Sequence, residues 1–208
     1  MTAIPQKTRF TPAEYYLREQ KAEFKSDYYT GEIFAMAEGT IRHCQICTNL
    51  IREVGNRLKG TPCWAFESNL RLAIKASGLR CHPDVTVFCG QFEKDIEDPT
   101  DETVTNPTVI FEVLSPSTEA YDRGLKAESF RQITSLRSYV FVSQSNAHIE
   151  WYLRQPDGSW LFREVKGLDE SLSIPDIKDR ASAEGSFRSR GVSDRTVTRL
   201  VIPHPPSR

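Results

Sequence analysis

A nearly uninterrupted run of apolar and β-branched residues at 107–114, Pro-Thr-Val-Ile-Phe-Glu-Val-Leu, limits the possible folds more than any other feature of this chain. Such a run is typical of a strand in the middle of a sheet, with both faces covered. Helical periodicity follows over residues 119–133, and a second apolar strand follows at 138–143. A strand, a helix and a strand in this order predict parallel pairing through a right-handed crossover.

Other segments predict antiparallel pairing. Residues 27–36 alternate aromatic and apolar positions around Thr30-Gly31, and two further strand patterns flank the turn at 155–159. We therefore expect an α/β fold with a mixed β-sheet flanked by helices, and with antiparallel hairpins. The remaining predicted elements are helices at 11–25 and 40–59 and strands at 63–66, 70–74 and 84–88.

Length and composition indicate one ordinary globular domain. The chain has 208 residues, of which 38% are hydrophobic and 26% charged. We expect residues 1–180 to form the domain and residues 181–208 to form a polar, Arg-rich tail. No apolar run approaches the roughly 18 residues of a membrane span, and the start lacks the apolar stretch of a signal peptide, so we expect a cytoplasmic protein without membrane contact.

Charge is balanced, with 27 Lys and Arg against 28 Asp and Glu. Overall charge therefore does not steer the chain toward nucleic acid, and any polyanion site must be local. Six of the acids gather in residues 90–106. Because the alternating acids, central Gly and terminal Glu of an EF-hand are absent, we interpret this stretch as a solvated surface loop rather than a calcium loop.

Five cysteines are scattered along the chain. The odd number favours reduced thiols over a disulfide framework. Cys44 and Cys47 form a C-x-x-C, which raises a zinc or redox hypothesis. The pair lies within a helical apolar pattern, with no second metal-binding pair at finger distance, so we interpret both as small buried hydrophobes.

Two acids interrupt strand patterns. Asp84 begins a strand directly after Pro83, and Glu112 alternates onto the same face as Ile110 and Leu114. An ionised carboxylate in such surroundings loses several kcal/mol of hydration unless a cation or strong donors replace the water. Two such acids near strand ends favour a divalent metal site.

The alternative for Glu112 is a buried ion pair with Arg71, Arg80 or Lys126. Of these, Lys126 lies on the helix that follows the strand, four residues after Asp122 and on the same helix face. That helix must pack back over the sheet. The Lys126 amine can therefore reach the strand that carries Glu112.

These passages resemble a known family. The resemblance covers residues 10–155 and rests on 29–36, on His43, on His-Pro-Asp-Val-Thr-Val at 82–87, on Glu-Val-Leu-Ser-Pro-Ser-Thr at 112–118 and on Asp-Arg-Gly-Leu-Lys at 122–126. Together they are similar to the Uma-two family of proposed restriction endonucleases, a branch of the PD-(D/E)XK nuclease superfamily.

The resemblance implies that the mixed β-sheet flanked by helices, with its antiparallel hairpins, is a restriction-endonuclease-like core. It also implies cleavage of phosphodiester bonds in DNA, with Mg²⁺ or Mn²⁺ held by Asp84, Glu112 and the carbonyl of Val113. In the superfamily a lysine two positions after the Glu assists the attacking water, but Leu114 occupies that position here. The resemblance implies that Lys126 takes its place. Analogy with nucleases of this architecture also suggests a homodimer.

Other interpretations remain open. The chain could be an inactive nuclease-fold protein that binds nucleic acid or a protein partner, because the usual lysine position is apolar. Zinc at Cys44 and Cys47 is a third hypothesis. His43 and His82 could contact the site or serve only in packing.

Overall fold

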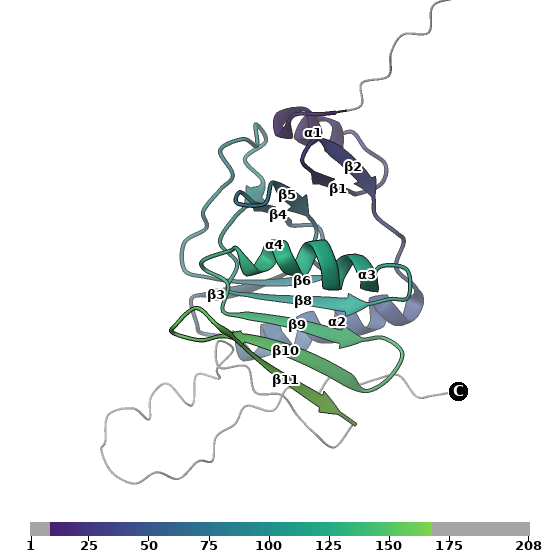
Figure 1. Cartoon of the computed structure of the whole chain (residues 1–208), viewed down its shortest axis with the longest axis vertical. Helices are drawn as coiled ribbons and strands as arrows, with labels where there is room; N and C mark the ends of the chain where they lie inside the picture. The colour runs from purple at the N-terminus through teal and green to yellow at the C-terminus, as the bar shows by residue number, and fades with distance from the viewer. Residues whose placement is uncertain (1–8, 168–208) are drawn as a thin grey trace, which may run out of the picture.

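The computed structural model describes residues 9–167 and shows a six-stranded sheet with helices on both faces and a five-stranded sheet beside it (Figure 1). The helical segments are α1 (Pro12–Glu19), α2 (Ile41–Arg57), α3 (Glu119–Tyr121), a π-helical segment (Asp122–Lys126) and α4 (Ala127–Arg131). The strands are β1 (Ser26–Tyr29), β2 (Glu32–Ala35), β3 (Cys63–Glu67), β4 (Arg71–Ile74), β5 (Leu79–Cys81), β6 (Val85–Cys89), β7 (Thr103–Val104), β8 (Val109–Leu114), β9 (Ser138–Ser143), β10 (His148–Arg154) and β11 (Trp160–Lys166). The predicted fold class is confirmed. The predicted tail at 181–208 lies outside the described residues.

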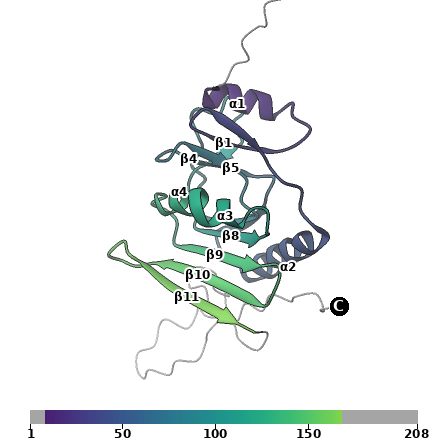
Figure 2. The same ribbon diagram turned by 45° about the vertical axis from the view of Figure 1, so that its right-hand side comes forward.

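The large sheet has the strand order β11-β10-β9-β8-β6-β3. β8 and β9 pair in parallel across the α3–α4 crossover, as predicted, and the other neighbours pair antiparallel. Figure 2 shows β8 to β11 lying side by side in this order. β8 is therefore an interior strand, and all six of its residues are buried.

The two faces of β8 contact different helices. Val109, Phe111 and Val113 pack in one core with the buried residues of α2, and Ile110 and Leu114 pack in a second core with α4. Side chains of a strand alternate between faces, so Glu112 belongs to the face covered by α3 and α4. Figure 1 shows α4 in front of the sheet and α2 behind it.

The helix starts agree with their sequence signals. The Thr11 hydroxyl accepts a hydrogen bond from the Glu14 amide, and the Glu14 carboxylate accepts one from the Thr11 amide, which forms a capping box at α1. Thr40 caps α2 by accepting from the His43 amide at 3.1 Å. The first helix ends at Glu19, six residues earlier than predicted.

The small sheet has the order β2-β1-β5-β4-β7. Its β1–β2 hairpin turns at Thr30 and Gly31, which both adopt positive φ, 46° and 100°, as predicted for this turn. Two of its strands, β5 and β7, were not predicted, because three and two residues are too few to show a periodic pattern.

The interpretation of residues 90–106 as a solvated loop is wrong for two acids. Asp98 pairs with Arg71 at 3.4 Å, and Asp95 pairs with Arg80 at 3.4 Å, and both carboxylates are fully covered. The segment is thus tied to β4 and β5 by buried ion pairs. The sequence pattern could not predict these ion pairs, because Arg71 lies 27 residues from Asp98 and Arg80 lies 15 residues from Asp95.

The interpretation of the cysteines as reduced is wrong for Cys63 and Cys89. They lie opposite each other in the β3–β6 register and form a disulfide. Cys44 is exposed rather than buried, and Cys47 is half-buried. Among the described residues, no helix combines the length and apolar character needed to cross a bilayer.

Candidate active site

Asp84 and Glu112 meet where β6 begins beside β8. The Asp84 carboxylate accepts a hydrogen bond from the Val113 amide at 2.7 Å. The Asp84 amide in turn donates to Glu112 Oε2 at 3.3 Å. The Asp84 side chain keeps 15% of its surface exposed, whereas Glu112 keeps 2%. Asp84 is therefore the member that solvent reaches, and Glu112 lies beneath it.

Lys126 contacts Glu112 from the opposite side. Its Nζ lies 3.1 Å from Glu112 Oε1 and 3.3 Å from Asp122 Oδ1. Of the three cations considered as partners for Glu112, only Lys126 pairs with it, because Arg71 and Arg80 bind the 90–106 segment. The structure thus brings Asp84, Glu112, Val113 and Lys126 together. Their catalytic roles stay predictions.

A π-helical segment supplies two of the buried charges. Residues Asp122–Lys126 form one wider turn, in which the Ala127 amide donates to the Asp122 carbonyl. Such turns are rare and occur often at functional sites. Asp122 and Lys126 are both buried at its ends. The sequence predicted a helix here but not its local widening.

The buried acids resist ionisation. Burial raises the pKa of Glu112 well above 4.5, and the nearby charges of Asp122 and Asp84 act in the same direction, while Lys126 opposes them. Burial also raises the pKa of Asp122. For Lys126 burial disfavours the ammonium, but the attraction of Glu112, Asp27 and Asp122 outweighs it and raises the pKa. The ammonium therefore stays charged, next to carboxyl groups whose ionisation burial opposes.

His43 approaches the same carboxylate from α2. Its Nε2 lies 3.2 Å from Asp84 Oδ2, and this hydrogen bond raises the pKa of the imidazole above 6.5. On the other side of the ring, Nδ1 lies 3.6 Å from the Cys47 sulfur. The sequence left open whether His43 contacts the site. The structure places it there.

His82 contacts a different acid, Asp27, which sequence reasoning missed. The Asp27 carboxylate accepts from the His82 amide at 3.3 Å and from the Tyr121 hydroxyl at 3.0 Å. Burial disfavours its charged form, but the His82 hydrogen bond and the nearby Lys126 outweigh burial and lower its pKa. The available signal was an acid within a strand pattern of apolar and aromatic residues, as at Glu112.

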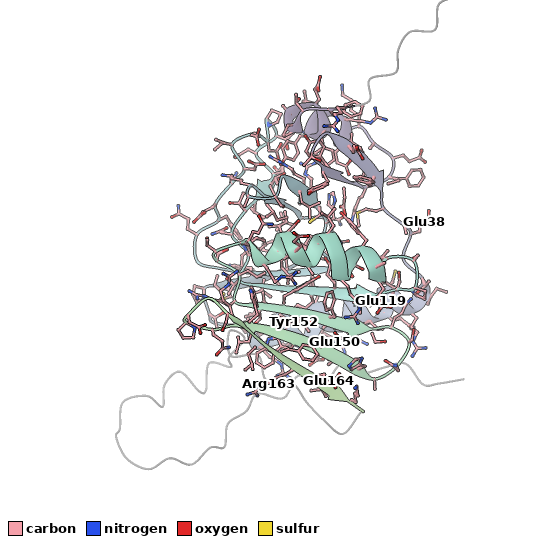
Figure 3. All side chains as sticks on the ribbon, viewed as in Figure 1. Glu38, Glu119, Glu150, Tyr152, Arg163 and Glu164 are labelled. Atoms are coloured by element: carbon pink, nitrogen blue, oxygen red, sulfur yellow. A yellow bond between two sulfur atoms is a disulfide. The ribbon has the colours of Figure 1, made fainter. Side chains whose placement is uncertain are left out.

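A polar pocket of about 220 Å³ opens beyond the ends of β8 and β9. Ser115, Ser143 and Asn146 line part of it, and Leu114, directly after Val113, forms another part. Arg123 also lines it, but its guanidinium binds Glu119 and Glu150, which Figure 3 labels. The lining also includes Glu119 and His148, so the pocket combines hydroxyl and amide groups with charged and ionisable side chains.

The residues at the junction of β6 and β8 fit a hard divalent cation such as Mg²⁺. Asp84 and Glu112 offer carboxylate oxygens, the ligand type that Mg²⁺ prefers. In extended backbone the amide and carbonyl of one residue point to the same side, so the Val113 carbonyl faces the strand that carries Asp84. Continuing the β6–β8 register places Pro83 opposite Val113, and proline has no N–H to donate to that carbonyl. A dication would also favour the ionised form of the Glu112 carboxyl group, which burial disfavours.

Comparisons with known proteins establish the family of this chain. The model of a family described as "Putative restriction endonuclease", Uma2, matches residues 12–182. The chain belongs to the Uma2 family. The family predicted from the motifs is thereby confirmed.

Two relatives from Synechocystis sp. support the assignment. "Uncharacterized protein slr1290" is 34% identical over 165 residues, covering 77% of this chain and 83% of that protein. "Uncharacterized protein sll1609" is 32% identical over 168 residues, covering 81% and 94%.

A solved structure shares the fold of this Uma2 protein. The crystal structure of a "putative nuclease belonging to DUF820" from Anabaena variabilis superposes with a TM-score of 0.64, covering 81% of this chain and 90% of that chain. The sequence identity is 16%, so this likeness establishes the fold alone.

Proposed function

We propose that this Uma2 protein is an endonuclease that hydrolyses phosphodiester bonds in DNA and depends on Mg²⁺, with Mn²⁺ as a substitute. The observation that carries the proposal is the convergence of Asp84, Glu112 and Lys126 at one strand junction. Asp84, Glu112 and the Val113 carbonyl would hold the ion. When bound, Mg²⁺ supplies a Lewis acid for the phosphate and lowers the pKa of the attacking water.

The chain's own residues have separate tasks in this proposal. Asp84, which solvent reaches, faces the substrate, and the Val113 amide and the His43 imidazole fix the orientation of its carboxylate. Lys126 keeps a permanent positive charge beneath the carboxylates, where it would stabilise negative charge that gathers on the phosphate. Its burial keeps competing water away from the ammonium. Leu114 packs in the core on this face and lines the pocket, but its side chain carries no charge.

Cleavage assays with supercoiled DNA and Mg²⁺ test the proposal. We expect Asp84→Ala and Glu112→Ala each to lose at least roughly 100-fold in rate, because each removes a metal ligand. Lys126→Ala should lose a similar factor at saturating Mg²⁺. Glu128→Ala and Lys59→Ala, which change exposed side chains of the same types, should retain the wild-type rate.

The outcomes separate the candidate functions. Cleavage that survives both acid substitutions would place the chemistry elsewhere. A wild-type protein that binds DNA in EDTA with a steep salt dependence, and never cuts it, would favour the inactive binding protein.

We further propose that the enzyme acts as a homodimer on the two strands, and a monomeric mass in light scattering would contradict this.

A further inference from the structure

A second set of possible metal ligands lies on the α2 side of Asp84. His43 and Cys47 are four residues apart and therefore share one face of α2. Nδ1 of His43 is 3.6 Å from the Cys47 sulfur, and Nε2 is 3.2 Å from Asp84 Oδ2. One ligand atom from each of the three residues can be chosen so that all lie within 4.8 Å of one another. A helix and a strand thus present nitrogen, sulfur and oxygen to one point.

This donor set suits a different metal from the Mg²⁺ that is proposed to bind Asp84 and Glu112. Thiolate and imidazole select borderline or soft ions, whereas Mg²⁺ takes oxygen ligands. Zinc binds at 2.0–2.3 Å, so its tetrahedral ligands are roughly 3.3–3.8 Å apart. The two measured contacts involve different nitrogens of His43, and only one of these nitrogens can bind the ion. With one nitrogen chosen, the three ligand atoms lie within 4.8 Å of one another, so a side-chain adjustment of about 1 Å would bring them into the zinc range.

We propose that His43, Cys47 and Asp84 form a binding site for Zn²⁺ or a similar divalent transition ion. Three protein ligands leave the fourth position open to water. The surroundings favour a cation, because the Asp84 carboxylate contributes negative charge 3.2 Å from the His43 ring. Metal binding would replace the thiol proton and offset that negative charge.

The C-x-x-C motif is not the ligand pair in this proposal. Cys44 is exposed, and its sulfur lies 3.9 Å from the Gly39 carbonyl. The pair at helical spacing is His43 with Cys47. The two cysteines of one motif therefore receive opposite predictions, which gives the experiment an internal control.

Sharing Asp84 couples the two metals. A zinc ion that occupies Asp84 from the α2 side would compete with Mg²⁺ for the same carboxylate, and the chain would be inhibited by zinc. This consequence rests on the proposed nuclease function. Binding of zinc itself does not.

Cobalt titration of the full chain tests the site without any activity assay. We expect Co²⁺ to produce visible bands of tetrahedral coordination and a near-ultraviolet charge-transfer band from a thiolate ligand. Competition with a chromophoric chelator gives the zinc affinity. Cys47→Ser should abolish the charge-transfer band, and Cys47→Ser and His43→Gln should each weaken zinc binding by more than about 100-fold, beyond the loss typical of outer-shell changes. Cys44→Ser should keep the band and the affinity.

Two results would overturn the proposal. One is a wild-type protein that shows no thiolate-to-cobalt band. The other is a Cys44→Ser variant that loses zinc as fully as Cys47→Ser, because the ligands would then be the C-x-x-C pair. Circular dichroism melts of each variant show whether it is folded, and His43→Gln tests the site should Cys47→Ser not fold. A protein that binds zinc but cuts no DNA would support the site and refute the nuclease.

Discussion

The charge balance around Lys126 depends on single residues. Its ammonium is the one group that contacts both Glu112 and Asp122 within the described residues, at 3.1 and 3.3 Å. Breaking a buried ion pair from one side is costly, because the remaining charge stays in a poorly solvated place. The same lysine that is proposed for catalysis is therefore also structural. Loss of activity in a Lys126 variant has to be separated from loss of stability.

Replacing Lys126 by methionine should lower the free energy of unfolding by about 3–5 kcal/mol at neutral pH in EDTA, because the two carboxylates lose their cation. Urea denaturation measures the change. Lys59→Met, at an exposed position, is the matched control and should change stability by less than about 0.5 kcal/mol. An equally stable Lys126→Met protein would show that Glu112 is protonated or solvated in the fold.

At the scale of elements, the segment between β6 and β8 is held by specific contacts. Asp98 accepts hydrogen bonds from Thr103 at 2.6 Å and from Thr100 at 2.7 Å, besides its pair with Arg71. Burial disfavours the ionised form of Asp98, but these donors outweigh burial and lower its pKa below 3.8. Its ionised form therefore stabilises the folded state. This stabilisation is present above pH 3.8 and is lost as the pH falls through the lower, folded-state pKa.

Asp98→Asn should accordingly lower the free energy of unfolding by roughly 1–3 kcal/mol at pH 7, and the difference from wild type should shrink as the pH falls below 3.8. Urea denaturation at a series of pH values measures it. Asp101→Asn, in the same segment with 71% of the side chain exposed, should show almost no difference at any pH. If the free energy of unfolding of Asp98→Asn were lower than that of wild type by the same amount at every pH, packing and neutral hydrogen bonds, and not the charge of Asp98, would hold the segment.

At the scale of the whole molecule, the disulfide ties an edge of the large sheet to its interior. β3 is the edge strand, and Cys63 joins it to Cys89 on β6, whose other end lies next to Asp84. The bridge closes a segment with a sequence separation of 26 residues that includes β4 and β5 of the small sheet. In the unfolded chain the bridge therefore limits the distance between the segments that form the two sheets, which lowers the conformational entropy of the unfolded state.

Removing this bridge should lower the free energy of unfolding by about 2–4 kcal/mol. The comparison is between oxidised protein, reduced protein and the double variant Cys63→Ser with Cys89→Ser, in urea. Reductant should destabilise wild type and Cys44→Ser equally and leave the double variant unchanged. Free thiols at Cys63 and Cys89 in protein purified without reductant would contradict the bridge.

The sequence by itself determined the local elements and the family. The continuous apolar run at 109–114 indicated an interior strand, helical spacing of apolar residues predicted the helix at 40–59, and the order of motifs identified the Uma2 family. These signals are local, because periodicity and capping depend on neighbours within a few residues. The same reasoning placed Glu112 and Lys126 on facing elements.

Only the tertiary structure decided which distant groups are partners. Three pairs of partners lie far apart in the sequence, and no local pattern encodes their contacts. These pairs are Asp27 with His82, His43 with Asp84, and Cys63 with Cys89. Each contact depends on strand register and helix packing, in which a shift of one residue would turn a side chain to the other face. The sequence therefore shows where the acids and cysteines lie along the chain. Only the packing of the sheets and helices determines which residue each of them contacts.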